Sequence, residues 1–136
     1  MPARPLNVVV CEHNILMATL YQVAFQEMGH AVLLARSGFE ALSMARTQTV
    51  DLLVASLGGV GAPGILTVLE IRKISPDVAV LICSGYSKPE NLRDMVRPPM
   101  AFLEKPFGLD RLTCAVRELA VQIENGRRGR ASAAIG

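Results

Sequence analysis

Short apolar runs alternate along this chain with longer stretches in which apolar residues recur at helical spacing. The apolar runs are Leu6 to Val10, Ala31 to Ala35, Asp51 to Ala55, Val78 to Cys83 and Ala101 to Leu103. Short runs of this kind, bounded by turn signals, are typical of strands that are buried on both faces of a parallel sheet. Their alternation with helices predicts five βα units joined by right-handed crossovers. We therefore expect an α/β fold with a doubly wound, five-stranded parallel sheet.

The first two stretches between these runs carry helix capping signals. The apolar residues of the first stretch include Ile15, Leu16, Leu20, Val23 and Ala24. Asn14 can cap this helix at its start, and Gly29 can end it. Ser37, followed three residues later by Glu40, is a capping box for a second helix. Both stretches are therefore predicted to be helices.

The next two helices are bounded by proline. A third helix begins near Ile65, after a loop rich in glycine, and Pro76 stops it. Ser87 with Glu90 forms another capping box, and Pro98-Pro99 ends the short helix that follows. These boundaries keep the two helices between the third and fifth apolar runs, as the alternation requires.

The last helix is expected from Leu109 to about Glu124, with Gly126 as its C-terminal cap. Residues 126–136 are rich in Arg, Ala, Gly and Ser, which predicts a flexible basic tail. At 136 residues the chain is the size of one domain. We expect a single domain over residues 1–125, followed by the tail over residues 126–136.

Composition excludes several classes of function. Hydrophobic residues make up 51% of the chain and aromatic residues only 4%, so the core is aliphatic and a base-stacking surface is not expected. The net charge is +2, and without Arg127, Arg128 and Arg130 the chain has 11 basic against 12 acidic residues. The folded part therefore offers no strong case for binding nucleic acid or a membrane surface.

The three cysteines have no metal-ligand spacing, which predicts reduced thiols in a cytoplasmic protein. We expect no signal peptide, because no apolar segment follows the first residues, and no membrane span, because no uninterrupted apolar stretch is long enough. His13 and His30 have no metal partner at useful spacing and are expected on the surface or in loops. Cys83 and Cys114 are expected in or near the core.

Side chains with chemical potential follow four of the predicted strands. Cys11 and Glu12 follow the first strand, Ser56 the third and Ser84 the fourth, and the fifth leads to Lys105. In open α/β sheets the ligand crevice lies outside the carboxyl ends of the strands. We therefore expect these five residues to converge on one pocket.

In this arrangement the chain resembles the receiver domain of two-component response regulators, over roughly Leu6 to Glu124. The resemblance rests on the order of strands and helices and on three motifs: Lys105-Pro106-Phe107, Cys83-Ser84-Gly85-Tyr86 and Ser37-Gly38-Phe39-Glu40-Ala41-Leu42. The Lys-Pro pair after the fifth strand is the most specific of them. The resemblance implies a flavodoxin-like receiver fold with strand order 2-1-3-4-5.

The family's phosphorylation site supplies an expectation for each of these positions. In the family, an acidic pair after strand one holds Mg²⁺, and an Asp after strand three accepts a phosphoryl group from a phosphohistidine. A Ser or Thr after strand four and a Lys after strand five contact the phosphoryl oxygens. Ser84 and Lys105 match these two positions, and Phe102 takes the place of the aromatic residue that changes rotamer on activation.

The departures from the family pattern fall on the chemistry of the site. Glu12 keeps one position of the acidic pair, but Cys11 occupies the other and Ser56 replaces the phosphoacceptor Asp. Three carboxylates and one lysine give the family site a net charge of −2, whereas Glu12 and Lys105 cancel here. A hard, oxygen-bound dication needs that negative surplus, and a thiol is a poor ligand for Mg²⁺. We expect Mg²⁺ binding to be weak or absent, with Glu12 the only remaining candidate ligand and no other cofactor.

These changes predict a degenerate receiver domain without enzymatic activity. Ser56 is expected to be a neutral, hydrogen-bonded placeholder, because a serine hydroxyl needs a general base to attack. Lys105 is expected to pair with Glu12 or to hydrogen-bond Ser56. The resemblance implies a stand-alone, atypical response regulator that acts by protein-protein interaction, with a histidine kinase, a phosphotransfer protein or another regulator as partner. The expected contact surface, also for a homodimer, comprises Lys88 to Val96, Ala101 to Leu103 and Leu109 to Glu124.

Two alternatives remain open at this point. The domain could be a phosphorylation-driven switch with a displaced acceptor, either Glu12 or Ser56. It could also be a thiol redox sensor through Cys11, if nearby Lys105 lowers the pKa of that thiol. We favour the simpler interpretation of Cys11 as a small apolar residue at a strand end.

Overall fold

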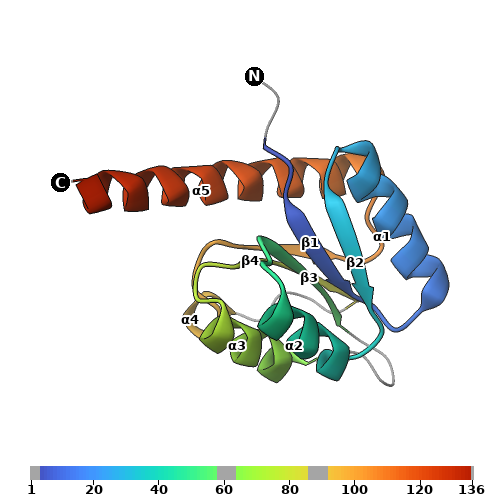
Figure 1. The fold of residues 1–136 in the computed structure, drawn as a ribbon. Helices are drawn as coiled ribbons and strands as arrows, with labels where there is room; N and C mark the ends of the chain where they lie inside the picture. The colour runs from blue at the N-terminus through green and yellow to red at the C-terminus, as the bar shows by residue number, and fades with distance from the viewer. Residues whose placement is uncertain (1–3, 58–63, 86–91, 136) are drawn as a thin grey trace.

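The structure, a computed structural model, describes residues 4–57, 64–85 and 92–135. Within them, five parallel strands form one sheet in the order β2-β1-β3-β4-β5. The labelled strands β2, β1, β3 and β4 can be followed in Figure 1. The strands are β1 (Asn7–Cys11), β2 (Ala31–Ala35), β3 (Leu52–Leu57), β4 (Ala79–Ser84) and β5 (Met100–Glu104). This order confirms the predicted doubly wound parallel sheet and the receiver fold.

The helices pack on both faces of this sheet. They are α1 (Ile15–Glu27), α2 (Gly38–Thr47), α3 (Ile65–Ile74), α4 (Leu92–Met95) and α5 (Leu109–Ile135). One buried cluster joins α1 and α5 to one face of the sheet, and a second joins α2, α3 and α4 to the other face. Neighbouring residues of a strand serve different clusters, as Val54 and Ala55 of β3 do, because strand side chains alternate between faces.

The capping signals of the first half of the chain are confirmed. Asn14 Oδ1 accepts a hydrogen bond from the backbone N–H of Met17, and Ser37 Oγ accepts one from that of Glu40. Gly29 ends α1 with a φ of 91°, a left-handed conformation that glycine adopts without steric cost. The capping box of Ser87 and Glu90, by contrast, lies outside the described residues.

The outward face of α1 is unexpectedly apolar. Of the five apolar residues that mark this helix in the sequence, only Ala24 is buried, together with Ala18, Tyr21 and Phe25. The other four are exposed to 62%, 70%, 56% and 48%, namely Ile15, Leu16, Leu20 and Val23. The helix is therefore apolar on both its buried and its outward side.

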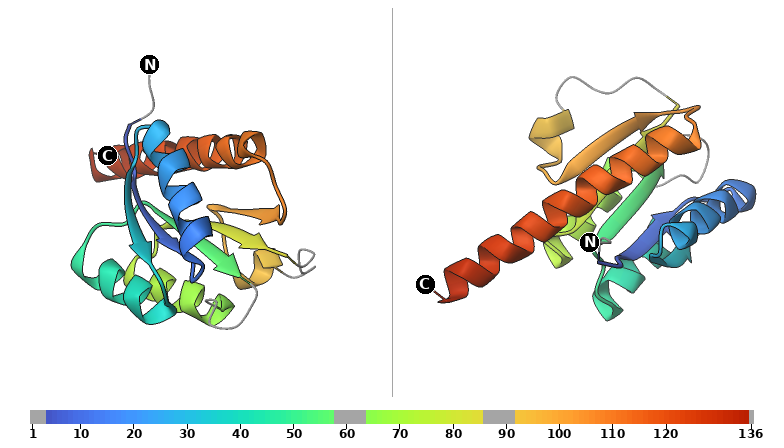
Figure 2. Two further views of the ribbon diagram at one scale, coloured as in Figure 1. Left: turned by 90° about the vertical axis from the view of Figure 1, so that its right-hand side faces the viewer. Right: turned by 90° about the horizontal axis from the view of Figure 1, so that it is seen from above.

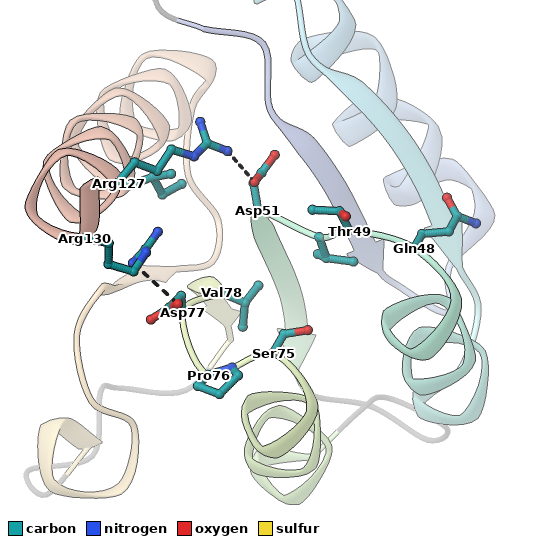
Figure 3. A pocket seen from close by; sticks show the side chains of 11 residues that line it. Gln48, Thr49, Asp51, Ser75, Pro76, Asp77, Val78, Arg127 and Arg130 are labelled. Atoms are coloured by element: carbon teal, nitrogen blue, oxygen red, sulfur yellow. Dashed lines mark hydrogen bonds and ion pairs between the residues drawn. The ribbon is translucent and has the colours of Figure 1, made fainter. Parts of the chain in front are cut away.

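The prediction that the last helix ends at Gly126 is wrong: α5 continues to Ile135. Its continuation lies against the amino end of the sheet, where Arg127 Nη2 is 2.6 Å from Asp51 Oδ1 and Arg130 Nη1 is 3.5 Å from Asp77 Oδ2 (Figure 3). These ion pairs provide a physical reason for the continued helix, because they stabilise the helical conformation that Gly126 by itself disfavours.

Candidate functional site

Three strand ends bring Glu12, Ser56 and Lys105 into direct contact. Ser56 lies at the end of β3 and is 1% exposed, and its hydroxyl donates a hydrogen bond of 2.7 Å to Glu12 Oε1. Lys105 Nζ in turn donates to Ser56 Oγ at 2.5 Å and lies 3.8 Å from Glu12 Oε1. The Ser56 hydroxyl thus bridges the Glu12 carboxylate and the Lys105 ammonium group, whose opposite charges balance each other.

The second oxygen of Glu12 is also occupied. Glu12 Oε2 accepts a hydrogen bond of 3.1 Å from the backbone N–H of Asn14, and His13 Nδ1 lies 3.2 Å from it. The Glu12 side chain is 2% exposed. Both oxygens of this buried carboxylate therefore have partners within the chain, as a buried charge requires.

This donor set does not fit the Mg²⁺ ion that the resemblance implies. Such an ion is held by oxygen ligands with a surplus of negative charge. Here the two Glu12 oxygens have partners within the chain, and the neighbouring strand-end residue is the thiol Cys11. Among the described residues, no group of three or more His, Cys, Asp or Glu side chains could hold a metal.

Cys11 is buried at 1% exposure, and its thiol is not activated. Burial, and after it the charges of Glu12 and Glu40, together raise the pKa of Cys11 to about 12. The expectation that Lys105 lowers the pKa of this thiol is therefore wrong. Lys105 acts instead on Cys83, but burial still raises the pKa of Cys83 to about 11.

Ser84 and Phe102 occupy the strand positions predicted for them. Ser84 is the last residue of β4 and is 6% exposed, and its carbonyl accepts a hydrogen bond of 2.6 Å from the backbone N–H of Lys105. Phe102 lies in β5, opposite Ile82 in register, and packs half-buried against the cluster that includes α3. The family roles of these two side chains remain predictions.

Tyr21 of α1 is a residue of this site that sequence reasoning missed. It is 2% exposed, and its hydroxyl is buried beside Cys83 and Ser56 without a well-oriented hydrogen bond to a described residue. Burial, followed by the neighbouring Cys83, raises the pKa of this phenol above its ordinary value. Its ring lies 6.3 Å from that of Phe107, so the motif after β5 packs on α1 beneath the candidate site.

Two further expectations about single residues are corrected by the structure. Cys114 is exposed, because α5 turns its position away from the sheet, whereas Cys83 is buried as expected. His30 is only 9% exposed, and its Nδ1 accepts a hydrogen bond of 3.0 Å from the backbone N–H of Leu6. Burial lowers the pKa of His30, although Asp51 opposes the shift. This histidine lies in the loop between α1 and β2, as expected, but it is buried there and holds the start of β1.

A cavity of about 430 Å³ lies at the opposite end of the sheet (Figure 3). Arg127 and Arg130 reach into this region from α5, toward Asp51 and Asp77 at the starts of β3 and β4. Ser56 is at the other end of β3, so the cavity is not the pocket that the sequence predicts.

No described helix is long and apolar enough to cross a membrane.

Comparison with known proteins identifies the class to which this fold and site belong. The family model of the response regulator receiver domain matches residues 8–117. The chain therefore belongs to the family of response regulator receiver domains.

Individual relatives agree with this assignment. The chain is 29% identical over 114 residues to the transcriptional regulatory protein ZraR of Escherichia coli, a match that covers 83% of this chain and 26% of that protein. It is 32% identical over 99 residues to the sensor kinase CckA of Brucella abortus, covering 71% of this chain and 10% of the kinase. The chain thus spans about a quarter or less of the length of these curated relatives.

Solved structures show the same fold. A CheY-like receiver domain protein from Methanospirillum hungatei superposes with a TM-score of 0.79 at 15% identity, over 90% of this chain and 99% of that one. NtrX from Brucella abortus superposes with a TM-score of 0.80 at 21% identity, over 94% of this chain and 29% of that one. At these identities the similarity concerns the fold alone.

Proposed function

We propose that this receiver domain signals through contacts with other proteins and that its pocket does not accept a phosphoryl group in the way that the family's aspartate does. The observation that carries the proposal is the hydrogen-bonded set of Glu12, Ser56 and Lys105. Where the family has an ionised acceptor beside a metal ion, this chain has a buried hydroxyl between two opposite charges.

The environment of Ser56 is unsuited to nucleophilic attack. A serine becomes a nucleophile when a free general base takes its proton. The acceptor of that proton is Glu12, whose other oxygen is bound by a backbone N–H and whose charge faces Lys105. Lys105 also donates a hydrogen bond to Ser56 Oγ, which draws electron density away from the oxygen that would attack. These contacts support a placeholder role for Ser56.

The charge of the pocket supports the same conclusion. Glu12 and Lys105 cancel, and the Glu12 oxygens already have donors, so Mg²⁺ gains little by displacing them. Without that ion, Lys105 is the cation in the described part of the pocket that could stabilise the charge that develops during phosphoryl transfer. Signalling by a domain of this kind depends on the concentration of its partner, or on one constant conformation of the domain that the partner binds. A histidine kinase, a phosphotransfer protein or another regulator is the class of partner that the family suggests.

The test is phosphorylation of the intact chain. Wild-type protein is incubated with acetyl phosphate and Mg²⁺, and its mass is measured without acid treatment. We expect no gain of a phosphoryl group, since the pocket lacks the acceptor carboxylate and keeps only Glu12 of the acidic pair.

A matched variant shows that the assay can detect the reaction. Cys11→Asp combined with Ser56→Asp returns the pocket to three carboxylates and one lysine. We expect this double variant to gain one phosphoryl group in the presence of Mg²⁺ and none in its absence. A mass gain in the wild-type chain contradicts the proposal. Acid-stable phosphate then indicates Ser56 as acceptor, and phosphate cleaved by hydroxylamine indicates Glu12.

The redox alternative has weaker support. Cys11 is buried and the pKa of its thiol is raised to about 12, so little thiolate is present at neutral pH. Selective oxidation of Cys11 over Cys114 by dilute peroxide, measured by peptide mapping, would revive this alternative.

A further inference from the structure

The outward face of α1 carries four large apolar residues and no charge over most of its length, and its exposed polar residues there, Thr19 and Gln26, are uncharged. Leu16, Leu20 and Val23 are exposed to 70%, 56% and 48%, and no charged residue lies between Ile15 and Gln26. A helix on the surface of a globular protein ordinarily turns charged and polar residues outward. The left panel of Figure 2 shows α1 at the front of the molecule, with no other element covering it. This face is therefore a candidate contact surface.

The exposed residues follow the spacing of a coiled-coil seam. From Leu16 to Leu20, Val23 and Glu27 the steps are four, three and four residues. Alternating steps of three and four keep one narrow stripe of side chains on one side of a helix, as at the a and d positions of a heptad. Leu20 and Val23 also line a groove of about 360 Å³ together with Leu109 at the start of α5. The stripe is thus continuous with an apolar hollow.

The charges at the two ends of α1 indicate which kind of partner can cover this face. Glu27, the only charged residue of α1, lies in the last turn, where the helix dipole is unfavourable for an acid. The first turn has no acidic residue, although the dipole favours one there. Leu20 stands midway between Glu27 and His13, which is 36% exposed just before the helix. An antiparallel copy of α1 centred on Leu20 therefore brings each Glu27 beside His13 at the partner's helix start. The acid next to that start, Glu12, is 2% exposed and pairs with Lys105.

We propose that a second copy of this chain covers this face. Two α1 helices pack antiparallel about a two-fold axis at Leu20, with Leu16 against Val23 of the partner subunit and Glu27 against the partner's helix start. A two-fold interface has to be self-complementary. A stripe of apolar residues with the acid Glu27 at one end and the positive end of the helix dipole at the other meets that condition. The proposal goes beyond the proposed function and holds whether or not the pocket accepts phosphate.

The surface expected from the sequence is less suited to self-association. In the described part of α4, β5 and α5, the large exposed apolar residues are Met95, Leu109 and Val121, exposed to 40%, 58% and 59%. They come from separate elements, and exposed charges lie among them: Arg93, Asp94, Glu104, Arg111, Arg117 and Glu118. Val121 of this surface therefore provides a matched control for Leu20, because the two side chains have similar exposure.

The test measures oligomeric state in phosphate-free buffer. Sedimentation equilibrium of the full chain, over a wide concentration range, is compared among wild type, Leu20→Glu and Val121→Glu. We expect a monomer–dimer equilibrium in the wild type, a dimer Kd raised at least tenfold in L20E, and an unchanged Kd in V121E. Glu is a good helix former and position 20 is exposed, so circular dichroism should show a folded L20E.

Cysteine cross-linking gives an independent readout that does not depend on destabilising the dimer. In a Cys114→Ser background, which removes the exposed native thiol, Leu20→Cys is expected to form a disulfide-linked dimer on mild oxidation, and Val121→Cys is not. Wild-type chain that stays monomeric at every concentration overturns the proposal. So does a dimer that V121E abolishes and L20E leaves intact. Neither result bears on phosphorylation, so failure here is distinguishable from failure of the proposed function.

Discussion

The two ends of β3 hold charged groups in contrasting ways. At the carboxyl end, Ser56 lies between Glu12 and Lys105, and the Glu12 side chain is 2% exposed. At the amino end, Asp51 pairs with Arg127 at 2.6 Å beside an open cavity, with side-chain exposures of 10% and 26%. In the buried set, the charge of Glu12 is balanced by that of Lys105. The more open pair attaches a helix to the sheet.

The contrast teaches how burial changes what an ion pair does. A charge without water nearby must have its partner, so removal of one partner at the carboxyl end leaves an expensive group behind. At the amino end, water can replace a lost partner, and the pair contributes less. The following variants test this difference, in order of decreasing effect.

Lys105→Met should have the largest effect on stability. The Met side chain fills similar space but leaves the Glu12 carboxylate buried without its cation, at a cost of about 3 kcal/mol in the free energy of unfolding. Urea denaturation measures this cost. Lys73→Met is the control, because Lys73 pairs with Glu70 at an exposed site where such pairs contribute about 0–1 kcal/mol. Equal losses in the two variants would contradict the distinction between the buried and exposed pairs.

Asp51→Asn should have an intermediate effect. Asp51 accepts hydrogen bonds from Arg127 and from the backbone N–H of Asn7, so loss of its charge should cost about 1.5 kcal/mol in urea denaturation. Hydrogen exchange of the backbone amides after Arg127 should become faster, since the end of α5 loses its attachment. Asp77→Asn, which removes the exposed 3.5 Å pair with Arg130, should change stability by less. A larger loss in D77N than in D51N would show that the exposed pair is the stronger one.

Acid should lower the free energy of unfolding by protonating His30, which holds the start of β1. Burial lowers the pKa of His30 in the folded chain, so the stability contribution of its neutral form is complete above its unfolded pKa of about 6.5. It is lost as the pH falls through the lower folded pKa, because protonated Nδ1 cannot accept the hydrogen bond from Leu6. Urea denaturation between pH 8 and 5 should show this decline, with a smaller slope in His30→Asn. An identical slope in both proteins would exclude His30 as the cause.

The labelling rates of the three cysteine thiols should report how well the carboxyl end of the sheet is buried, in an experiment that leaves stability unchanged. In the folded chain, maleimide labelling at neutral pH should modify the exposed Cys114 first. Cys11 and Cys83 should react only after unfolding, because burial raises the pKa of their thiols to about 12 and about 11. Peptide mapping by mass spectrometry measures the order. Early labelling of Cys11 would mean that the pocket opens far more readily than its burial implies.

The fold could be predicted from the sequence because its signals are local or periodic. The apolar runs identified all five strands, and the caps at Asn14, Ser37 and Gly29 marked helix ends that the structure confirms. The strand order came from the resemblance to receiver domains, and the structure confirms it. Part of the candidate site could be predicted from the sequence for the same reason, since parallel strands bring Glu12, Ser56 and Lys105 to one edge of the sheet.

Other features depended on partners that are distant along the chain. Tyr21 was missed because nothing in α1 indicates that its ring lies beside Phe107 and its hydroxyl beside Cys83. The extent of α5 was misjudged because Gly126 is a local stop signal, whereas Asp51, which pairs with Arg127, lies 76 residues away.

The sequence by itself thus determined the alternation of strands and helices, the class of fold, and the presence of Cys11 and Ser56 where the resemblance implies acidic residues. Periodicity, capping and residue identity are properties of neighbouring positions, so no coordinates are needed to recognise them. Only the tertiary structure decided which side of α1 faces water, whether Lys105 acts on Cys11, and where α5 ends. Exposure, pKa and long-range ion pairs depend on which groups surround a side chain in space, and that surrounding exists only once the chain has folded.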